Sequence, residues 1–133
     1  MPVAKWHNLG ENRVLNILLG ATPVDGALYL GLYTNPTELA ETAILSDIDE
    51  VASVSGYARK TLTRGSWVIT GDAAVYAIQT FLAQGGDWGN VTGYFIATSL
   101  DDSGVLLATE HFDVALPIVD TKGVKIESQI TVA

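Results

Sequence analysis

Cysteine is missing from this 133-residue chain. Its absence excludes disulfides, thiolate metal sites and a cysteine nucleophile together, and it gives no indication of the redox compartment. Histidine is scarce as well, because only His7 and His111 can supply an imidazole.

Basic residues are few, with seven lysines and arginines against fifteen acidic residues and a net charge of −8. This balance argues against a nucleic-acid binder that neutralises phosphates, and it disfavours an anionic membrane surface. Charged residues make up only 17% of the chain, whereas about 25% is typical. We therefore expect part of the outer surface to be covered by a partner.

Long apolar runs are also absent, and no stretch of about 18 apolar residues exists that would cross a membrane. Glu11, Asn12, Arg13 and Asn16 interrupt the run of ~7–15 apolar residues that an export signal needs. A chain of this length fits a single domain, residues 1–133, with a sizeable core.

The clearest positive pattern is three runs of β-branched and aromatic residues at 75–81, 91–98 and 105–112. Glycine-rich and aspartate-rich turns at 84–90 and 101–104 separate them. The pattern predicts a three-stranded antiparallel meander that needs a second layer over its apolar face.

Further strands are predicted from alternating residues, whereas the segment around Pro117 reads as irregular. The predicted fold is mainly β: a single antiparallel β-sandwich, jelly-roll-like, of roughly seven or eight strands with one short N-terminal helix. These further strands are residues 27–34, 56–64, 66–70 and 124–132, and the irregular segment is 113–121.

Residues 1–20 are predicted to form an N-terminal arm and helix. Asn8 is placed to cap it, Glu11 completes a capping box, and Gly20 is expected to end it in the left-handed conformation. Val14, Ile17 and Leu18 share one face. This short helix must lay that stripe either on the sheet or on a neighbouring subunit.

Residues 35–55 form a long acidic connection, with five acidic and no basic residues from Glu38 to Ser55. Loops beyond about 12–15 residues usually carry function or are mobile. Asp47-Ile48-Asp49-Glu50 lacks the spacing and the glycine of an EF-hand, so a solvated loop is favoured over a calcium site.

Arg59 is the candidate structural cation, because Arg59 and Lys60 point to opposite faces of a predicted strand. A buried guanidinium needs a carboxylate or carbonyl partner and would organise the structure around it. A surface-facing ladder of charges is the alternative.

Trp88 lies in a glycine-flanked turn. A large aromatic side chain there either anchors a partner or a sugar, or caps the open end of the sandwich.

Catalytic patterns are weak. Acidic pairs for glycoside hydrolysis have no sign of facing each other, and a serine–histidine–acid triad with His7 or His111 lacks a Gly-x-Ser-x-Gly elbow. We expect no enzyme, no cofactor and no metal site.

Several strand and turn segments resemble a layout found in small virion structural proteins of tailed bacteriophages. They are Gly56-Tyr57-Ala58-Arg59, Trp67, Gly93-Tyr94-Phe95-Ile96-Ala97, Leu30-Gly31-Leu32-Tyr33-Thr34 and the strand from Ile126 to Val132. The resemblance implies a non-enzymatic component of the virion, assembled in the host cytoplasm, most simply a capsid decoration (cement) protein on the head shell. A tail-associated or receptor-binding protein, or a carbohydrate-binding module, is the alternative.

The same resemblance implies partners among virion proteins, such as the major capsid protein, and copies of the chain itself, with a trimer preferred. We expect the N-terminal helix and the acidic connection to make these contacts through apolar anchors. The candidate interface residues are Trp6, Val14, Ile17, Leu18, Ile44, Leu45, Ile48 and Trp88.

Overall fold

The computed structural model describes residues 4–132. It is mainly β with one α-helix and antiparallel sheets in a sandwich-like arrangement, which confirms the predicted fold class. The elements are β1 Lys5–Trp6, α1 Asn8–Leu19, β2 Ala27–Tyr33, the 3-10 turn η1 Leu45–Asp47, β3 Lys60–Thr63, β4 Val68–Thr70, β5 Ala73–Val75, β6 Gln79–Leu82, β7 Gly89–Ala97, β8 Leu106–Ile118, β9 Gly123–Ile126 and β10 Gln129–Thr131.

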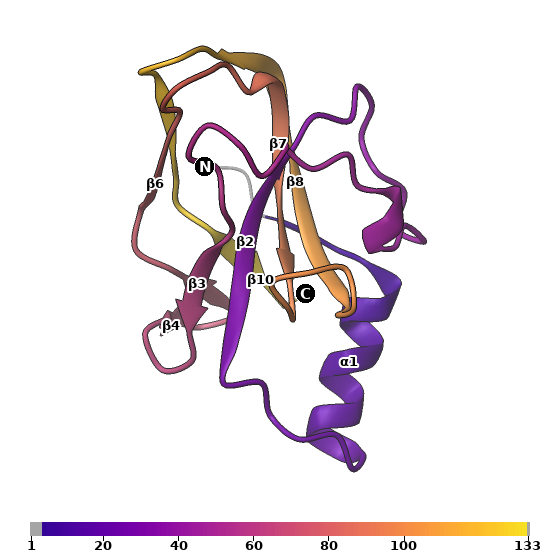
Figure 1. Cartoon of the computed structure of the whole chain (residues 1–133). Helices are drawn as coiled ribbons and strands as arrows, with labels where there is room; N and C mark the ends of the chain where they lie inside the picture. The colour runs from indigo at the N-terminus through magenta and orange to yellow at the C-terminus, as the bar shows by residue number, and fades with distance from the viewer. Residues whose placement is uncertain (1–3, 133) are drawn as a thin grey trace.

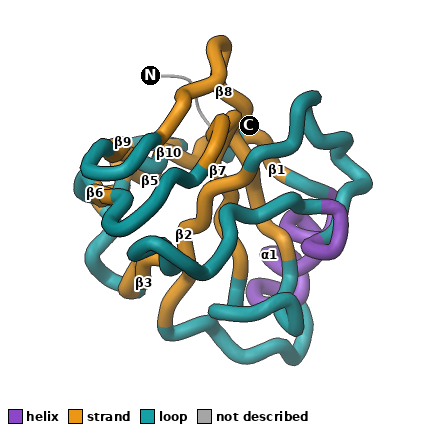
Figure 2. Tube along the Cα trace, turned by 45° about the horizontal axis from the view of Figure 1, so that its top comes forward, coloured by secondary structure: helices purple, strands orange, loops and turns teal. Residues whose placement is uncertain are grey.

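The strands form a five-stranded sheet in the order β1-β8-β7-β2-β3 and two smaller sheets, β10-β5-β4 and β6-β9. Figure 1 shows β2, β7 and β8 side by side, with β6 on one side of them and α1 on the other. The tube in Figure 2 shows the same separation between the β6-β9 pair and α1.

The central strands are buried on both faces. Leu30 and Leu32 of β2 belong to the main core with Tyr94 and Ile96 of β7, while Phe95 belongs to a second cluster on the opposite face. Successive side chains of a strand point to opposite faces of the sheet, so each face needs its own cover. The small sheets contribute to the main core, and the connection after β2 covers the second cluster.

The predicted meander is only partly correct. β7 pairs with β8 as expected, but the first run divides into β5 and β6, and β6 pairs with β9 instead of β7. The predicted final strand divides at the same level into β9 and β10, and β10 pairs with β5. The two interrupted strands, β5 with β6 and β9 with β10, therefore lie antiparallel to each other. Each finds its partner in a segment distant in the sequence.

The segment around Pro117 was predicted as irregular, but β8 continues through it to Ile118. Asn90 and Pro117 are opposite each other in the register of β7 and β8. On its other side β8 has only β1, which reaches no further than Thr109. A proline that cannot donate to the ladder is tolerated where a strand has a neighbour on one side only.

The helix begins and ends near the predicted residues, and Gly20 is its C-cap as expected, but the capping interactions differ from the prediction at both ends. His7 is the N-cap and makes no side-chain capping bond, so the capping box of Asn8 and Glu11 is wrong. The amide of Asn8 instead donates to the carbonyl of Glu41 at 3.0 Å. Gly20 ends the helix with a φ of −106°, in extended rather than left-handed backbone.

The acidic connection lies on its own sheet instead of extending outward. Leu39, Ala43 and Leu45 pack with Tyr33 and Phe95 in the second cluster. Its backbone is tied down by bonds from the Thr34 amide to the carbonyl of Asp49 and from the Val51 amide to the carbonyl of Leu32. These contacts hold the connection against its own sheet, so Leu39, Ala43 and Leu45 are buried within the chain.

Arg59 holds this connection to the rest of the sandwich. Its guanidinium donates to both carboxylate oxygens of Glu50, at 2.9 and 2.7 Å, and to the carbonyls of Ser99 and Asp101, both at 2.9 Å. It also forms an ion pair with Asp102 at 2.9 Å. The side chain is only 5% exposed and lies 4.9 Å from the centre of the Phe95 ring.

Tyr57 extends the network. Its hydroxyl donates to Glu50 at 2.5 Å and accepts from the backbone amide of Leu32 at 2.9 Å. Burial raises the pKa of Tyr57, and the neighbouring carboxylate raises it further. Burial alone would lower the pKa of Arg59, but its bonds to Glu50 and Asp102 outweigh that effect, so the pKa is raised. Both groups therefore keep fixed protonation states at any ordinary pH.

We predict that Arg59→Met lowers the free energy of unfolding by about 2–4 kcal/mol, because it leaves the Glu50 carboxylate without its partner and two carbonyls without donors. Urea unfolding followed by tryptophan fluorescence measures the change. Lys125→Met is the matched control, because Lys125 is exposed on β9 and should change the stability by less than about 0.5 kcal/mol. Equal effects of the two substitutions would contradict the assigned role of Arg59.

Candidate interaction groove

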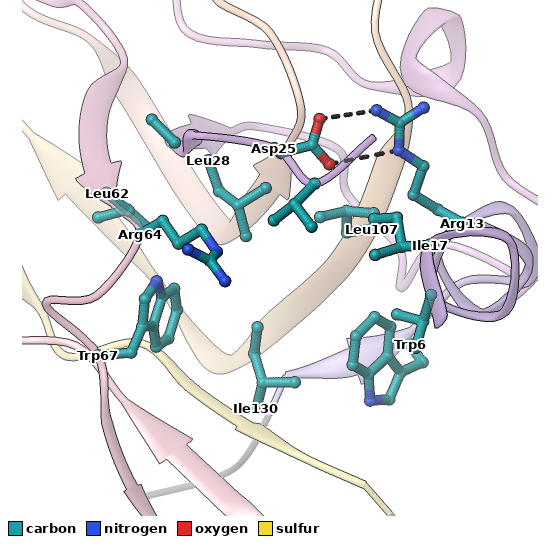
Figure 3. Close-up of a pocket in the computed structure, with 13 residues that line it drawn as sticks. Trp6, Arg13, Ile17, Asp25, Leu28, Leu62, Arg64, Trp67, Leu107 and Ile130 are labelled. Carbon is teal, nitrogen blue, oxygen red and sulfur yellow. Dashed lines mark hydrogen bonds and ion pairs between the residues drawn. The ribbon is translucent and has the colours of Figure 1, made fainter. Parts of the chain in front are cut away.

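An apolar groove opens between α1 and the sandwich, with a cavity volume of about 230 Å³. Figure 3 shows the side chains that line it, which come from separate parts of the chain. The apolar lining comes from α1, β2, β3, the start of β8 and the middle of β10. These side chains are Val14, Ile17, Leu28, Leu62, Leu107 and Ile130.

Two tryptophans flank the groove, with Ile130 between them (Figure 3). The indole of Trp6 is oriented by a bond from Nε1 to the carbonyl of Thr131 at 2.9 Å. Trp67 packs edge to face against Tyr76, with ring centroids 5.1 Å apart. Both rings are half-buried and fixed by their own contacts, so they are rigid walls rather than mobile side chains.

Two cations border the groove, but only one is neutralised. Arg13 forms an ion pair with Asp25 at 2.7 Å, which closes the side between α1 and β2. Arg64 makes no ion pair or side-chain hydrogen bond with any residue between 4 and 132, and Figure 3 shows its guanidinium directed toward the groove. The groove therefore offers apolar surface together with one available positive charge.

A second hollow, of about 380 Å³, continues the groove along the other side of α1. Trp6 and Val14 line both hollows, and the second adds Leu15, Thr131 and Val132. Glu11 lies at its border. Beyond it the helix leaves Leu18 and Leu19 on the surface, with 72% and 83% of their area exposed. Contiguous apolar surface of this kind marks an interaction site on a protein.

The position of α1 depends on a close approach between two backbones. A Cβ atom on Gly10 would lie 2.4 Å from the carbonyl oxygen of Leu107 in β8. Glycine is therefore required at this position, although it is an unfavourable residue within a helix. The contact sets the distance between α1 and the sheet, and with it the width of the groove.

His7 anchors the start of α1. Its side chain is fully buried, its amide donates to the carbonyl of Leu107 at 2.9 Å, and Nε2 lies 2.8 Å from Oγ1 of Thr109. Burial lowers the pKa of His7 below 6.5, and the charge of Lys5 acts in the same direction. The imidazole is therefore a neutral structural group at neutral pH.

The predicted interface residues separate into two groups. Trp6, Val14 and Ile17 come together in the groove, and Leu18 lies exposed on the same helix. In the acidic connection Ile44 is 44% exposed, and Ile48 is half-buried against the second cluster.

Leu45 and Trp88 are buried within the chain, with only 5% and 7% of their surface exposed, so they offer almost nothing to a neighbour. Trp88 donates through Nε1 to the carbonyl of Ser55 at 3.0 Å and packs edge to face on Tyr57. It caps the end of the sandwich, which is the alternative considered from its sequence context. Leu45 of the acidic connection packs in the second cluster of the core instead of lying on the surface.

Sequence reasoning missed Leu28, Leu62, Arg64, Trp67 and Ile130 as parts of one site. They come from segments far apart in the chain, and no spacing rule relates them. Trp67 carried the only signal, since a tryptophan next to a turn often serves recognition.

Between residues 4 and 132, no group of three or more histidine, aspartate or glutamate side chains is placed to hold a metal ion. Within the same range, no helix is long and apolar enough to span a membrane.

The chain was compared with known protein families. The family model for the podophage GP4 fiber I protein gp80 matches residues 5–132. No curated protein matches the chain.

We predict that the stability of the protein falls as the pH drops below about 6.5, because the unfolded chain binds a proton on His7 that the folded chain resists. His7→Gln should remove this component, so the two proteins should differ in the slope of unfolding free energy against pH below about pH 6.5. Denaturant titrations at closely spaced pH values measure it, with His111→Gln as the control. Parallel profiles for the wild type and His7→Gln would show that the imidazole does not contribute.

Gly10→Ala should destabilise the protein by at least about 1 kcal/mol, even though alanine favours a helix by about 1 kcal/mol over glycine. The reason is the collision of the new Cβ with the carbonyl of Leu107. Thermal unfolding by circular dichroism measures the effect, with Leu18→Ala as a control on the exposed side of the same helix. A gain in stability for Gly10→Ala would mean that α1 does not pack this closely.

Proposed function

The chain belongs to the family of the podophage GP4 fiber I protein gp80, and from this premise we propose that it is a structural protein of the phage tail fibre apparatus. The match over residues 5–132 supports this proposal, since it covers nearly the whole chain. It favours the tail-associated alternative considered from the sequence and gives no support to the preferred expectation of a capsid decoration protein. Membership of the family makes the chain a phage virion structural protein.

The geometry supports a role in assembly. A fibre component must bind neighbouring proteins through rigid surface, and here α1 and the sandwich frame an apolar groove with fixed tryptophan walls. Rigid aromatic anchors lose little conformational freedom on binding. No chemical step is required of any residue in this role.

A sugar is a poor match for the same groove. Carbohydrate hydroxyls need several hydrogen-bonding partners, and a site that lacks them leaves these groups unpaired. The groove is lined almost entirely by apolar side chains, and the carboxylate of Asp25 is already engaged by Arg13. A protein surface with apolar side chains and an acidic group fits it better.

The location is tested by immunogold electron microscopy of the phage that encodes this chain, with antibodies raised against the purified protein. We expect gold at the tail, and antibodies against the major capsid protein serve as the control that labels the head. Gold confined to the head would refute the tail proposal and return the decoration protein as the better assignment.

A further inference from the structure

The two hollows beside α1 form one continuous surface with opposite charges at its two ends. Trp6 and Val14 lie in the middle, because they line both hollows. Arg64 borders the first hollow and Glu11 borders the second. Neither of these two side chains has an ion-pair partner in the part of the chain that the structure describes.

We propose that this surface, which we call the α1 face, binds a second copy of the same chain about a twofold axis. The α1 face is defined by Trp6, Glu11, Val14, Leu15 and Arg64. A twofold axis places the same patch on both sides of the contact, so a cation at one end meets the anion at the other end of the partner copy. Arg64 of each copy then lies opposite Glu11 of the other, with the apolar centre between them.

The charges of the α1 face favour a second copy of the chain over an unrelated partner. Each chain carries a net charge of −8, so two copies repel each other unless opposite charges meet at the contact. In the twofold arrangement the α1 face provides two such pairs, because Arg64 of each copy meets Glu11 of the other. An unrelated partner would need a complementary charge pattern of its own, whereas this surface already complements itself.

The apolar centre supplies the affinity and the charges supply the register. Leu15 is 56% exposed and Val132 is 65% exposed at the border of the second hollow. Burial of such side chains drives association, whereas exposed ion pairs contribute mainly to orientation and to the rate of encounter. The dimer should therefore weaken only moderately with salt and strongly on loss of the apolar side chains. The inference does not depend on where in the particle the chain is located.

The experiment is a charge exchange followed by sedimentation equilibrium of the full chain. Arg64→Glu places two glutamates opposite each other, and Glu11→Arg places two arginines there, so each variant alone should dimerise about tenfold more weakly than wild type. An equimolar mixture of the two variants restores both opposite-charge pairs, and it should form a heterodimer with near wild-type affinity. The double variant should recover self-association in the same way.

Two controls separate the specific pairs from net charge. Lys122→Glu and Asp113→Arg make the same changes in charge at exposed positions that do not border either hollow, and they should dimerise like wild type. Circular dichroism of every variant verifies that the fold is intact.

Three results would overturn the proposal. The first is a wild-type chain that stays monomeric up to high micromolar concentration. The second is self-association of the two single variants at wild-type strength. The third is recovery by the double variant but not by the mixture, because a head-to-tail ring of three copies cannot satisfy all its contacts with two different variants, and the twofold axis would then be wrong.

Discussion

The guanidinium of Arg59 is the group on which the architecture depends, because a charge that is 5% exposed must have all its partners in place. Its partners come from two segments distant in sequence: Glu50 in the acidic connection, and Ser99, Asp101 and Asp102 in the turn between β7 and β8. Neither segment could move without leaving the charge uncompensated. The interaction therefore fixes the cover over Phe95 and closes the second cluster of the core.

This constraint determines which surface remains for assembly. A connection of this length and acidity is the kind of loop that often reaches out to a partner. Here its buried residues and its bonds to Arg59 hold it against its own sheet. One apolar surface that the chain leaves uncovered lies at α1, where Leu15, Leu18 and Leu19 are exposed. The acidic charge of the connection serves internal pairing as well as solubility.

The sequence predicted local features well and long-range partners poorly. Alternation in residues 27–34 and 91–98 located β2 and β7. The neighbouring cations Arg59 and Lys60, on opposite faces of one predicted strand, suggested that Arg59 is a structural cation. Alternation tells which residues share a face, but it does not tell which strand lies alongside, so β6 was assigned to β7 instead of β9. The groove depends most strongly on such long-range contacts. Trp6, for example, is oriented by a hydrogen bond to Thr131, which is 125 residues away in the sequence.

The N-terminal segment shows how one short helix serves stability and recognition at the same time. The side that carries Gly10 must touch β8 closely enough to exclude any side chain, and the buried His7 fixes the first turn. These contacts use only the start of α1, and the later turns hold Val14 and Ile17 over the groove and leave three leucines exposed. A helix of twelve residues is marginal in isolation, so its rigid attachment is what allows the free side to act as a preformed surface. Loss of the contact between α1 and β8 would therefore abolish the groove before it unfolded the sandwich.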